Sequence, residues 1–386
     1  LKIRGSWGLV GNDATNAGRF AYMEDLVLGG SDSYTTGIRQ DTYYSGPSWN
    51  RYFNPDLTWE VGEKINLGLD LQLFNDFNLT FDIFREKRRD IFMTRENSIP
   101  EIVGTGETKI TSNNGEMENK GLDLAIDYNK QITKDFFLSF KSTLTFARNK
   151  VLKMDESPYF EYPGLSDVGH PLGTYWGYVA DGLFPDQETI DNSPRQDLGY
   201  TPQPGDIKYV NQPNAKGEYD NVINSNDRVA IGHPYDPELV YGFGPSMKWK
   251  NWDFSFFFQG VARTSFMMYG MHPFGTTSIK NMLQFVADDH WSVDNPNPNA
   301  AYPRLTKDSN GNNDQYSTYW LRNAAFLKLK NAEIGYTYKG MRFYLSGVNL
   351  LTFSPFKHWD PEMGGGNGLY YPTQRVFNIG FQMTIQ

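Results

Sequence analysis

Residues that could do acid–base, metal or nucleophilic chemistry are few and scattered in this chain of 386 residues. The histidines show no His-Glu-x-x-His spacing, no Gly-x-Ser-x-Gly segment presents a serine nucleophile, and no glycine loop for a phosphate is present. Asp288, Asp289 and His290 are consecutive and could form a metal or base cluster, but such a triplet is far more often a loop or a short helix cap. The sequence therefore predicts no catalytic residue and no enzymatic activity.

A second group of polar residues, rich in Asp and Asn, lies between positions 205 and 228. Carboxylate and amide oxygens are ligands that calcium prefers, so the candidate ligands are Asp206, Asn224, Asn226 and Asp227. The segment lacks the Asp-x-Asp-x-Asp-Gly spacing of a calcium loop, and a turn capped by its own side chains is the commoner structure. We therefore expect no metal and no cofactor, with calcium at these four residues as the less favoured alternative.

Aromatic side chains are the third group with binding chemistry. The chain contains 24 Tyr, 27 Phe and 9 Trp, and aromatic ring faces can stack on sugars or pack against apolar peptide side chains. The candidate ligand-binding residues lie in the long connections described below and are Tyr43, Tyr44, Trp49, Trp176, Trp291, Tyr319 and Trp320. For each of them, packing within a loop or contact with a covering partner protein is the commoner role.

The elements that must position these residues are strands with one apolar and one polar face. Apolar and polar residues alternate with a period of two, most clearly at Ile65, Leu67, Leu69, Leu71 and Leu73. The apolar phase changes between Leu329 and Ile334, which predicts a β-bulge near Asn331. The pattern predicts ten strands, at 1–10, 57–73, 77–93, 117–131, 134–150, 239–250, 252–263, 324–339, 341–351 and 375–386.

The bulk composition limits the class of protein. No cysteine is present, which excludes thiol and disulfide chemistry. The formal net charge is −9 and no basic run occurs, so no nucleic-acid partner is expected. The mean hydropathy is −0.57, and no run of 18 apolar residues could form a transmembrane helix. A membrane-spanning barrel strand remains compatible with these values, because it needs only about ten residues with alternate ones apolar.

The connections between the predicted strands alternate strictly between tight turns and long loops. The tight turns are Phe74-Asn75-Asp76, Ile132-Thr133, Asn251 and Gly340. The long loops cover about 11–56, 94–116, 151–238, 264–323 and 352–374. Short turns at one end and long loops at the other are typical of antiparallel outer-membrane β-barrels. The pattern therefore predicts an all-β transmembrane barrel with extracellular long loops and a periplasmic C-terminus. Its lumen would be lined by polar residues such as Asp70, Asp82 and Asp253.

Several segments then become specific when they are taken in order. The sequence resembles the SusC-type (RagA/SusC-like) TonB-dependent outer-membrane transporters, and the likeness runs over residues 1–386. It is carried by Leu1-Lys2-Ile3-Arg4-Gly5-Ser6-Trp7-Gly8, Asn54-Pro55-Asp56-Leu57-Thr58-Trp59-Glu60, Glu116-Met117-Glu118-Asn119-Lys120-Gly121, Gly173-Thr174-Tyr175-Trp176-Gly177-Tyr178, Asp181-Gly182-Leu183-Phe184, Phe326-Leu327-Lys328-Leu329-Lys330-Asn331 and Leu345-Ser346-Gly347-Val348-Asn349-Leu350-Leu351-Thr352.

The resemblance implies a barrel of 22 strands with an N-terminal plug, of which residues 1–386 would be the C-terminal part, without the plug. It also implies import of glycans or oligopeptides through the outer membrane of a Gram-negative bacterium, in contact with outer-membrane lipids. The implied partners are the TonB system, acting through the missing part, and a SusD-like surface lipoprotein. One departure from the family is the last residue, Gln386, where many barrels end on an aromatic residue.

Two other hypotheses stay open on the sequence alone. A self-closed ten-stranded outer-membrane barrel could act as an adhesin or a surface enzyme. A soluble β-rich binding protein is the third hypothesis, although strands of this length are unusual for one. Pairing between the first and the last strand would favour the self-closed barrel and contradict the importer.

Overall fold

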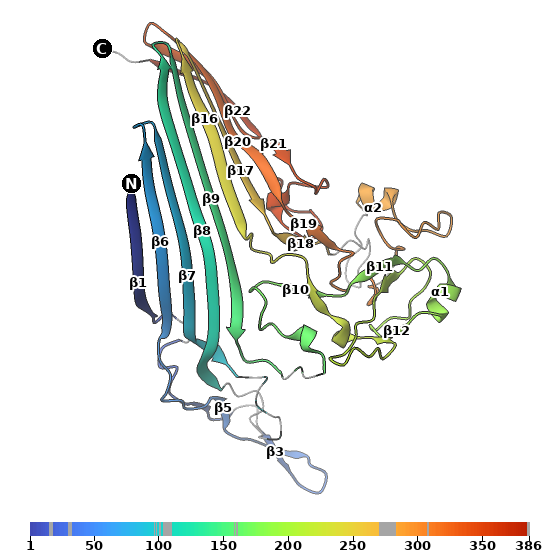
Figure 1. The fold of residues 1–386 in the computed structure, drawn as a ribbon. Coiled ribbons are helices and arrows are strands. Elements are labelled where there is room, and N and C mark those ends of the chain that lie inside the picture. The colour runs from blue at the N-terminus through green and yellow to red at the C-terminus, as the bar shows by residue number, and fades with distance from the viewer. Residues whose placement is uncertain are drawn as a thin grey trace.

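The computed structural model describes residues 1–14, 18–29, 33–95, 97, 99, 102, 110–157, 159, 161–269, 283–306 and 309–383. Ten long strands form one antiparallel sheet in the order β1-β6-β7-β8-β9-β16-β17-β20-β21-β22 (Figure 1). Their bounds are β1 Lys2–Asn12, β6 Glu60–Leu73, β7 Phe77–Thr94, β8 Thr111–Thr133, β9 Phe136–Lys153, β16 Leu239–Trp249, β17 Trp252–Ala262, β20 Phe326–Tyr338, β21 Met341–Phe353 and β22 Val376–Met383. The ten predicted strands are therefore confirmed.

Some strand ends differ from the prediction, and these differences shorten the loops. The predicted loop 94–116 is too long, because β8 begins at Thr111 and continues its ladder with β7 past two irregularities in register. Strand β9 extends to Lys153 and strand β21 to Phe353, so the loops that follow them begin slightly later than expected. Residues 384–386, which were predicted to complete the last strand, lie outside the described residues.

The two faces of the sheet differ in polarity, as the period of two predicts. Leu67, Ile83, Leu122 and Phe146 lie in one row across β6, β7, β8 and β9, and we call their side of the sheet the apolar face. The opposite, polar face carries carboxylates and arginines. There Arg4 of β1 donates hydrogen bonds to Asp70 and Asp82.

The predicted bulge is also present. Strand β17 pairs Phe257 with Asn331 and the next residue, Phe258, with Leu329, so Lys330 is the extra residue on β20. The bulge restores the alternation after the change of phase, because one inserted residue moves every following side chain to the other face.

Tight turns join β6 to β7, β8 to β9, β16 to β17 and β20 to β21, all at one end of the sheet, which we call the tight-turn end. Phe74 and Asn75 have φ values of 53° and 60°, as in the type I′ turns that match the twist of paired strands. The last strand ends at the tight-turn end, because Met383 pairs with Met341 beside the β20–β21 turn (Figure 1).

The sheet is open within the described residues. Strand β1 pairs with β6, strand β22 pairs with β21, and no pairing joins β1 to β22. The hypothesis of a self-closed ten-stranded barrel is therefore wrong for this chain, because closure would need these two strands to share a ladder.

The opposite, long-loop end carries short elements (Figure 1). They are β2 Asp25–Val27, β3 Ser33–Thr36, β4 Thr42–Ser45, β5 Ser48–Arg51, η2 Pro163–Leu165, β10 Tyr175–Gly177, β11 Ala180–Leu183, α1 Gln187–Asp191, β12 Arg195–Gln196, β13 Ile207–Tyr209, β14 Val222–Ile223, η3 Ser225–Asp227, β15 Val229–Ile231, β18 Ser265–Met267, α2 Gln284–Asp288, β19 Leu321–Asn323 and η4 Pro361–Met363. Among the described residues, no helix combines the length and apolar character needed to cross a membrane.

Candidate ligand-binding site

The loops after β9, β17 and β21 fold together around a hydrophobic core of their own, which we call the loop core. Its buried members come from segments far apart in the sequence and include Ile207, Ile223, Phe266, Met268, Val286, Tyr302, Trp320 and Phe356. The loop that follows β1, which carries β3 and β5, lies apart from this mass in Figure 1. A buried core of this kind holds loop side chains in fixed positions, as a binding site requires.

A cavity of about 310 Å³ lies in the loop core. Its lining includes the aromatic side chains of Tyr269, Tyr302, Tyr316 and Trp320 and the polar side chains of Arg304 and Asn310. Pockets for small ligands are commonly of this size and have apolar and aromatic walls with a few fixed polar groups. We therefore take this cavity as the candidate ligand-binding site.

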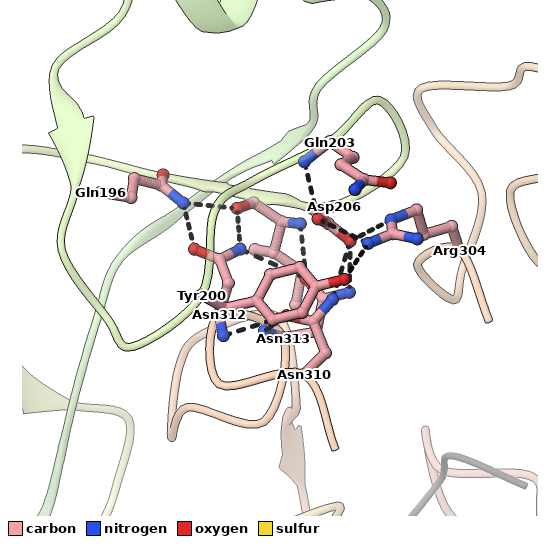
Figure 2. A network of polar contacts seen from close by, with 9 residues as sticks. Gln196, Tyr200, Gln203, Asp206, Arg304, Asn310, Asn312 and Asn313 are labelled. Carbon is pink, nitrogen blue, oxygen red and sulfur yellow. Dashed lines mark hydrogen bonds and ion pairs between the residues drawn. The ribbon is translucent and has the colours of Figure 1, made fainter. Parts of the chain in front are cut away.

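The polar wall of the cavity is fixed by Asp206, which is fully buried. Arg304 Nε donates to Asp206 Oδ1 at 2.7 Å, and the side-chain amides of Asn310 and Asn313 donate to the same oxygen at 3.0 and 2.8 Å. The other oxygen, Oδ2, accepts from the backbone N–H of Gln203 at 2.8 Å. Figure 2 shows these donors converging on one carboxylate from two segments about 100 residues apart. A buried charge that is paired and fully hydrogen-bonded keeps both segments in register.

Two further contacts hold Arg304 in place. Its Nη2 donates to the Tyr200 hydroxyl at 2.8 Å, and the guanidinium lies 5.7 Å from the centre of the Tyr200 ring. On the other side of the network, Gln196 joins Asn312 to the backbone carbonyl of Ile207 (Figure 2). The result is a rigid polar wall with one buried anion and one cation.

Burial shifts the pKa values of several titratable side chains in and around the loop core. Burial raises the pKa of Tyr302 and that of Tyr319, so both phenols stay neutral at physiological pH. Burial and the nearby Arg322 lower the pKa of His358, so this imidazole is neutral at pH 7. Burial opposes the charge of Arg304, but the Asp206 carboxylate outweighs it and holds the pKa of Arg304 above its ordinary value.

Three of the aromatic residues predicted to bind ligand lie together in the loop core. Trp320 lines the cavity, and its Nε1 donates to the Asn313 carbonyl at 2.7 Å. Tyr319 packs edge-on against Trp320, with its hydroxyl bonded to the Ala300 carbonyl at 2.8 Å. Trp291 is 7% exposed and packs over Gly205. Only Trp320 among these three contributes to the cavity wall.

The other predicted aromatic residues lie elsewhere. Trp176 on β10 donates to Asp167 at 2.7 Å and packs edge-on against His170. Tyr43 and Tyr44 on β4 are exposed, and Trp49 on β5 stacks on Tyr52, with ring centres 5.8 Å apart. None of these residues lines the cavity. A role for them in binding stays a prediction, and it would concern a surface separate from the cavity.

Several residues that line the cavity were not selected from the sequence. Tyr269, Tyr302 and Tyr316 belong to the same predicted loop as Trp320 and carry the same kind of side chain. Arg304 and Asn310 gave no signal, because their significance depends on Asp206, about 100 positions earlier in the chain.

The four candidate calcium ligands fall into two separate sets of hydrogen bonds. Asp206 accepts from the donors described above. Asn224 and Asp227 form a capping box around η3, and Asn226 donates its backbone N–H to the Asn224 side chain. Burial raises the pKa of Asp227, which also disfavours its charged form. This arrangement does not fit one calcium site shared by all four residues, and the absence of a metal stays a prediction.

Comparison with known proteins gives the class of protein. The family model described as TonB dependent receptor-like, beta-barrel, matches residues 17–350, so the chain belongs to this family. The ten-stranded sheet is accordingly a part of a larger transmembrane barrel wall, without the plug.

Individual relatives cover the whole chain. TonB-dependent receptor P26 of Formosa agariphila is 28% identical over 420 residues, which are 100% of this chain and 40% of that protein. TonB-dependent receptor SusC of Bacteroides thetaiotaomicron is 28% identical over 410 residues, or 99% of this chain and 37% of that protein. The chain thus spans about 40% of the length of the curated relatives it matches.

Solved structures share the fold. A structure of the RagAB peptide transporter matches 99% of this chain and 40% of its own chain, with a TM-score of 0.68 and 22% identity. The RagAB peptide importer in the open-open state matches with a TM-score of 0.71 and 20% identity.

Proposed function

We propose that this chain forms the C-terminal part of the barrel wall, and the binding loops, of a TonB-dependent importer in the outer membrane of a Gram-negative bacterium. The cargo would be a glycan or an oligopeptide, and the protein would work with a SusD-like surface lipoprotein. The observation that carries the proposal is an aromatic cavity with a fixed polar wall, held at the long-loop end of a sheet with one apolar and one polar face.

The two faces of the sheet suit a barrel wall. The apolar face would contact lipid, and the polar face, with Asp70, Asp82 and Asp253, would line a wet lumen. Because sheet edges cannot face lipid without leaving backbone groups unsatisfied, β1 and β22 would each pair with a further strand of the complete barrel.

The orientation follows from the connections. Tight turns of outer-membrane barrels are periplasmic and long loops extracellular, which would place the cavity outside the cell and the end of β22 in the periplasm. The loop core would then meet incoming cargo first. Force from the TonB system would act on a plug domain, and the chain itself would perform no chemistry.

The names of the relatives give a cargo in one case only. SusC is a TonB-dependent receptor by name, and the RagAB structures are described as those of a peptide transporter or importer. The cavity is compatible with each, since ring faces bind sugars as well as apolar side chains, and Arg304 offers a cation to a peptide carboxylate or to an acidic sugar.

Growth and uptake test the proposal directly. A strain that lacks the full-length gene is grown on one glycan or one oligopeptide at a time as the nutrient. Uptake of the labelled cargo is then measured with and without a functional TonB protein. We expect growth and uptake to be lost on one cargo class and to be restored by the wild-type gene only when TonB is active. Uptake that persists without TonB contradicts the energy-coupled mechanism.

A variant of the cavity tests whether the cavity, and not another part of the barrel, binds the cargo. Tyr269 and Tyr316 line the cavity but are about half exposed, so the double variant Tyr269→Ala/Tyr316→Ala should fold and lose cargo affinity about tenfold. Tyr219→Ala is the matched control, because Tyr219 is exposed on the loops and does not line the cavity. Equal loss in both variants would contradict the cavity as the cargo site.

A further inference from the structure

Three cations lie side by side on the apolar face, across three neighbouring strands. Arg85 of β7 pairs in register with Lys120 of β8, and Lys120 pairs with Arg148 of β9. We call these three residues the cationic row. The row of Ile83, Leu122 and Phe146 lies two residues nearer the tight-turn end on the same face. On these three strands the cationic row therefore follows directly after an apolar row.

The position of this border fits the thickness of a membrane. On β8, Lys120 and Lys130 share the apolar face and lie ten positions apart, with Leu122, Leu124, Ile126 and Tyr128 between them. Ten residues of strand extend about 33 Å, which a tilt of about 40° reduces to an apolar band about 25 Å high. Lys130 pairs with Asp76 beside a tight turn, so Lys120 marks the other border.

Like charges opposite one another in a sheet are unfavourable, and the chain only partly compensates them. Arg85 and Lys120 share Glu118, with distances of 2.6 and 2.7 Å. Arg148 and Arg263 share Glu238, at 3.1 and 2.6 Å. Four cations thus share two carboxylates, in a protein whose formal net charge is −9. The local positive charge is a feature of this surface and does not follow from the overall composition.

These side chains are accessible and border a cleft. The side chains of Arg85, Lys120 and Arg148 are 52%, 59% and 55% exposed. A cleft of about 620 Å³ is lined by Ile83, Leu122 and Phe146 together with the cations Lys120, Arg148 and Lys150 and one carboxylate, Glu118. Such a surface is complementary to an amphiphile with an anionic head and apolar chains.

We propose that the cationic row binds the phosphate of a phosphorylated lipid headgroup in the leaflet on the long-loop side, with the acyl chains against Ile83, Leu122 and Phe146. Arginine and lysine donors suit phosphate oxygens, because charge-assisted hydrogen bonds to phosphate are strong. The proposal rests on the membrane position and orientation of the proposed function, which make this the outer leaflet, but it is independent of what is transported.

Lipid retention by the purified full-length receptor tests this inference. The detergent-solubilised protein is mixed with lipid A carrying its phosphates or with enzymatically dephosphorylated lipid A, and bound lipid is quantified by native mass spectrometry. We expect the phosphorylated form to bind the wild-type protein at least tenfold more tightly. The variant Lys120→Gln/Arg148→Gln should reduce that preference about tenfold.

Lys141→Gln is the matched control. Lys141 lies on β9 with an exposure of 71%, but its position in the alternation places it on the polar face, so its replacement should leave lipid binding unchanged. If the double variant fails to assemble, Lys120→Gln alone carries the test. Equal binding of both lipid forms, or no loss on substitution, overturns the proposal.

The other occupant of such a surface would be an acidic protein. A photo-crosslinker placed at Arg85 in cells should label lipid, and labelling of a protein instead would also overturn the proposal. Cargo uptake tests the proposed function and is measured separately from lipid retention. A receptor that retains phosphorylated lipid but imports nothing would contradict the proposed function alone.

Discussion

The Lys328 ammonium nitrogen lies 2.5 Å from Asp360 Oδ2, and the Lys328 side chain is completely buried. Glu362 supplies a second carboxylate at 2.5 Å, and Lys330 binds Glu362 at 2.8 Å. Because Lys328 belongs to β20 and both carboxylates belong to the loop between β21 and β22, these ion pairs attach that loop to the wall.

Replacing Lys328 by Met should detach this loop. The change leaves two largely buried carboxylates without their shared cation, and we expect a local loss of stability of about 3 kcal/mol. Limited proteolysis of the full-length protein should show new cleavage within residues 354–375. Lys330→Met is the control, and it should have a clearly smaller effect because Lys330 is partly exposed and Glu362 keeps Lys328.

Acid should weaken the same attachment. Burial opposes the charge of Asp360 and that of Glu362, but Lys328 outweighs it, so the pKa of each carboxyl is below its ordinary value. A carboxyl whose pKa is lower in the folded state stabilises the fold above its unfolded pKa of about 4, and this contribution is lost as the pH falls further. The protection of residues 354–375 against hydrogen exchange, after correction for the intrinsic pH dependence of amide exchange, should therefore stay constant between pH 7 and 5 and fall below about pH 4.

The buried Asp206–Arg304 pair predicts that replacing one carboxylate by an amide will strongly destabilise the loop core. Asp206→Asn removes the charge that balances a buried guanidinium, and we expect about 3 kcal/mol of destabilisation in the loop core, with weaker cargo binding. Thermal unfolding followed by tryptophan fluorescence measures the first effect. Asp197→Asn is the control, because Asp197 is 56% exposed and its pair with Arg195 lies on the surface. Similar midpoints for the two variants would show that Asp206 does not organise the cavity.

Alanine variants of two glycines in the same region distinguish destabilisation by backbone strain from destabilisation by a packing clash. Gly205 has a φ of 87°, and a Cβ there would lie 2.2 Å from the Trp291 ring, whereas Gly199 has a φ of 75° and open space around it. Both Gly→Ala variants should lose about 1–2 kcal/mol from the left-handed backbone. Gly205→Ala should lose another 1–3 kcal/mol by displacing Trp291, which a shift in tryptophan emission would report. Equal unfolding free energies would contradict the packing role of Trp291.

The strands were predictable because each has one face against lipid and one against water. Apolar and polar residues therefore alternate along each strand with a period of two. Even the bulge at Lys330 appeared as a change of phase. The start of β8 was not predictable, since Thr111, Asn113 and Gly115 give that segment no apolar face. Of the residues that line the cavity, only Trp320 was predicted from the sequence to bind ligand. Its other walls depend on contacts between segments about 100 residues apart, such as Asp206 with Asn310, for which no local pattern exists.

The strands β7, β8 and β9 continue well past the cationic row. Strand β8 runs from Lys120 to Thr111, nine positions further, which is about 30 Å of strand and roughly 20 Å of height at the usual tilt. If the row marks the lipid headgroups, this part of the sheet projects beyond the membrane surface on one side of the barrel. Cargo capture would then be screened from the lipids, so that a bacterium could change its surface lipids without changing what the loops select.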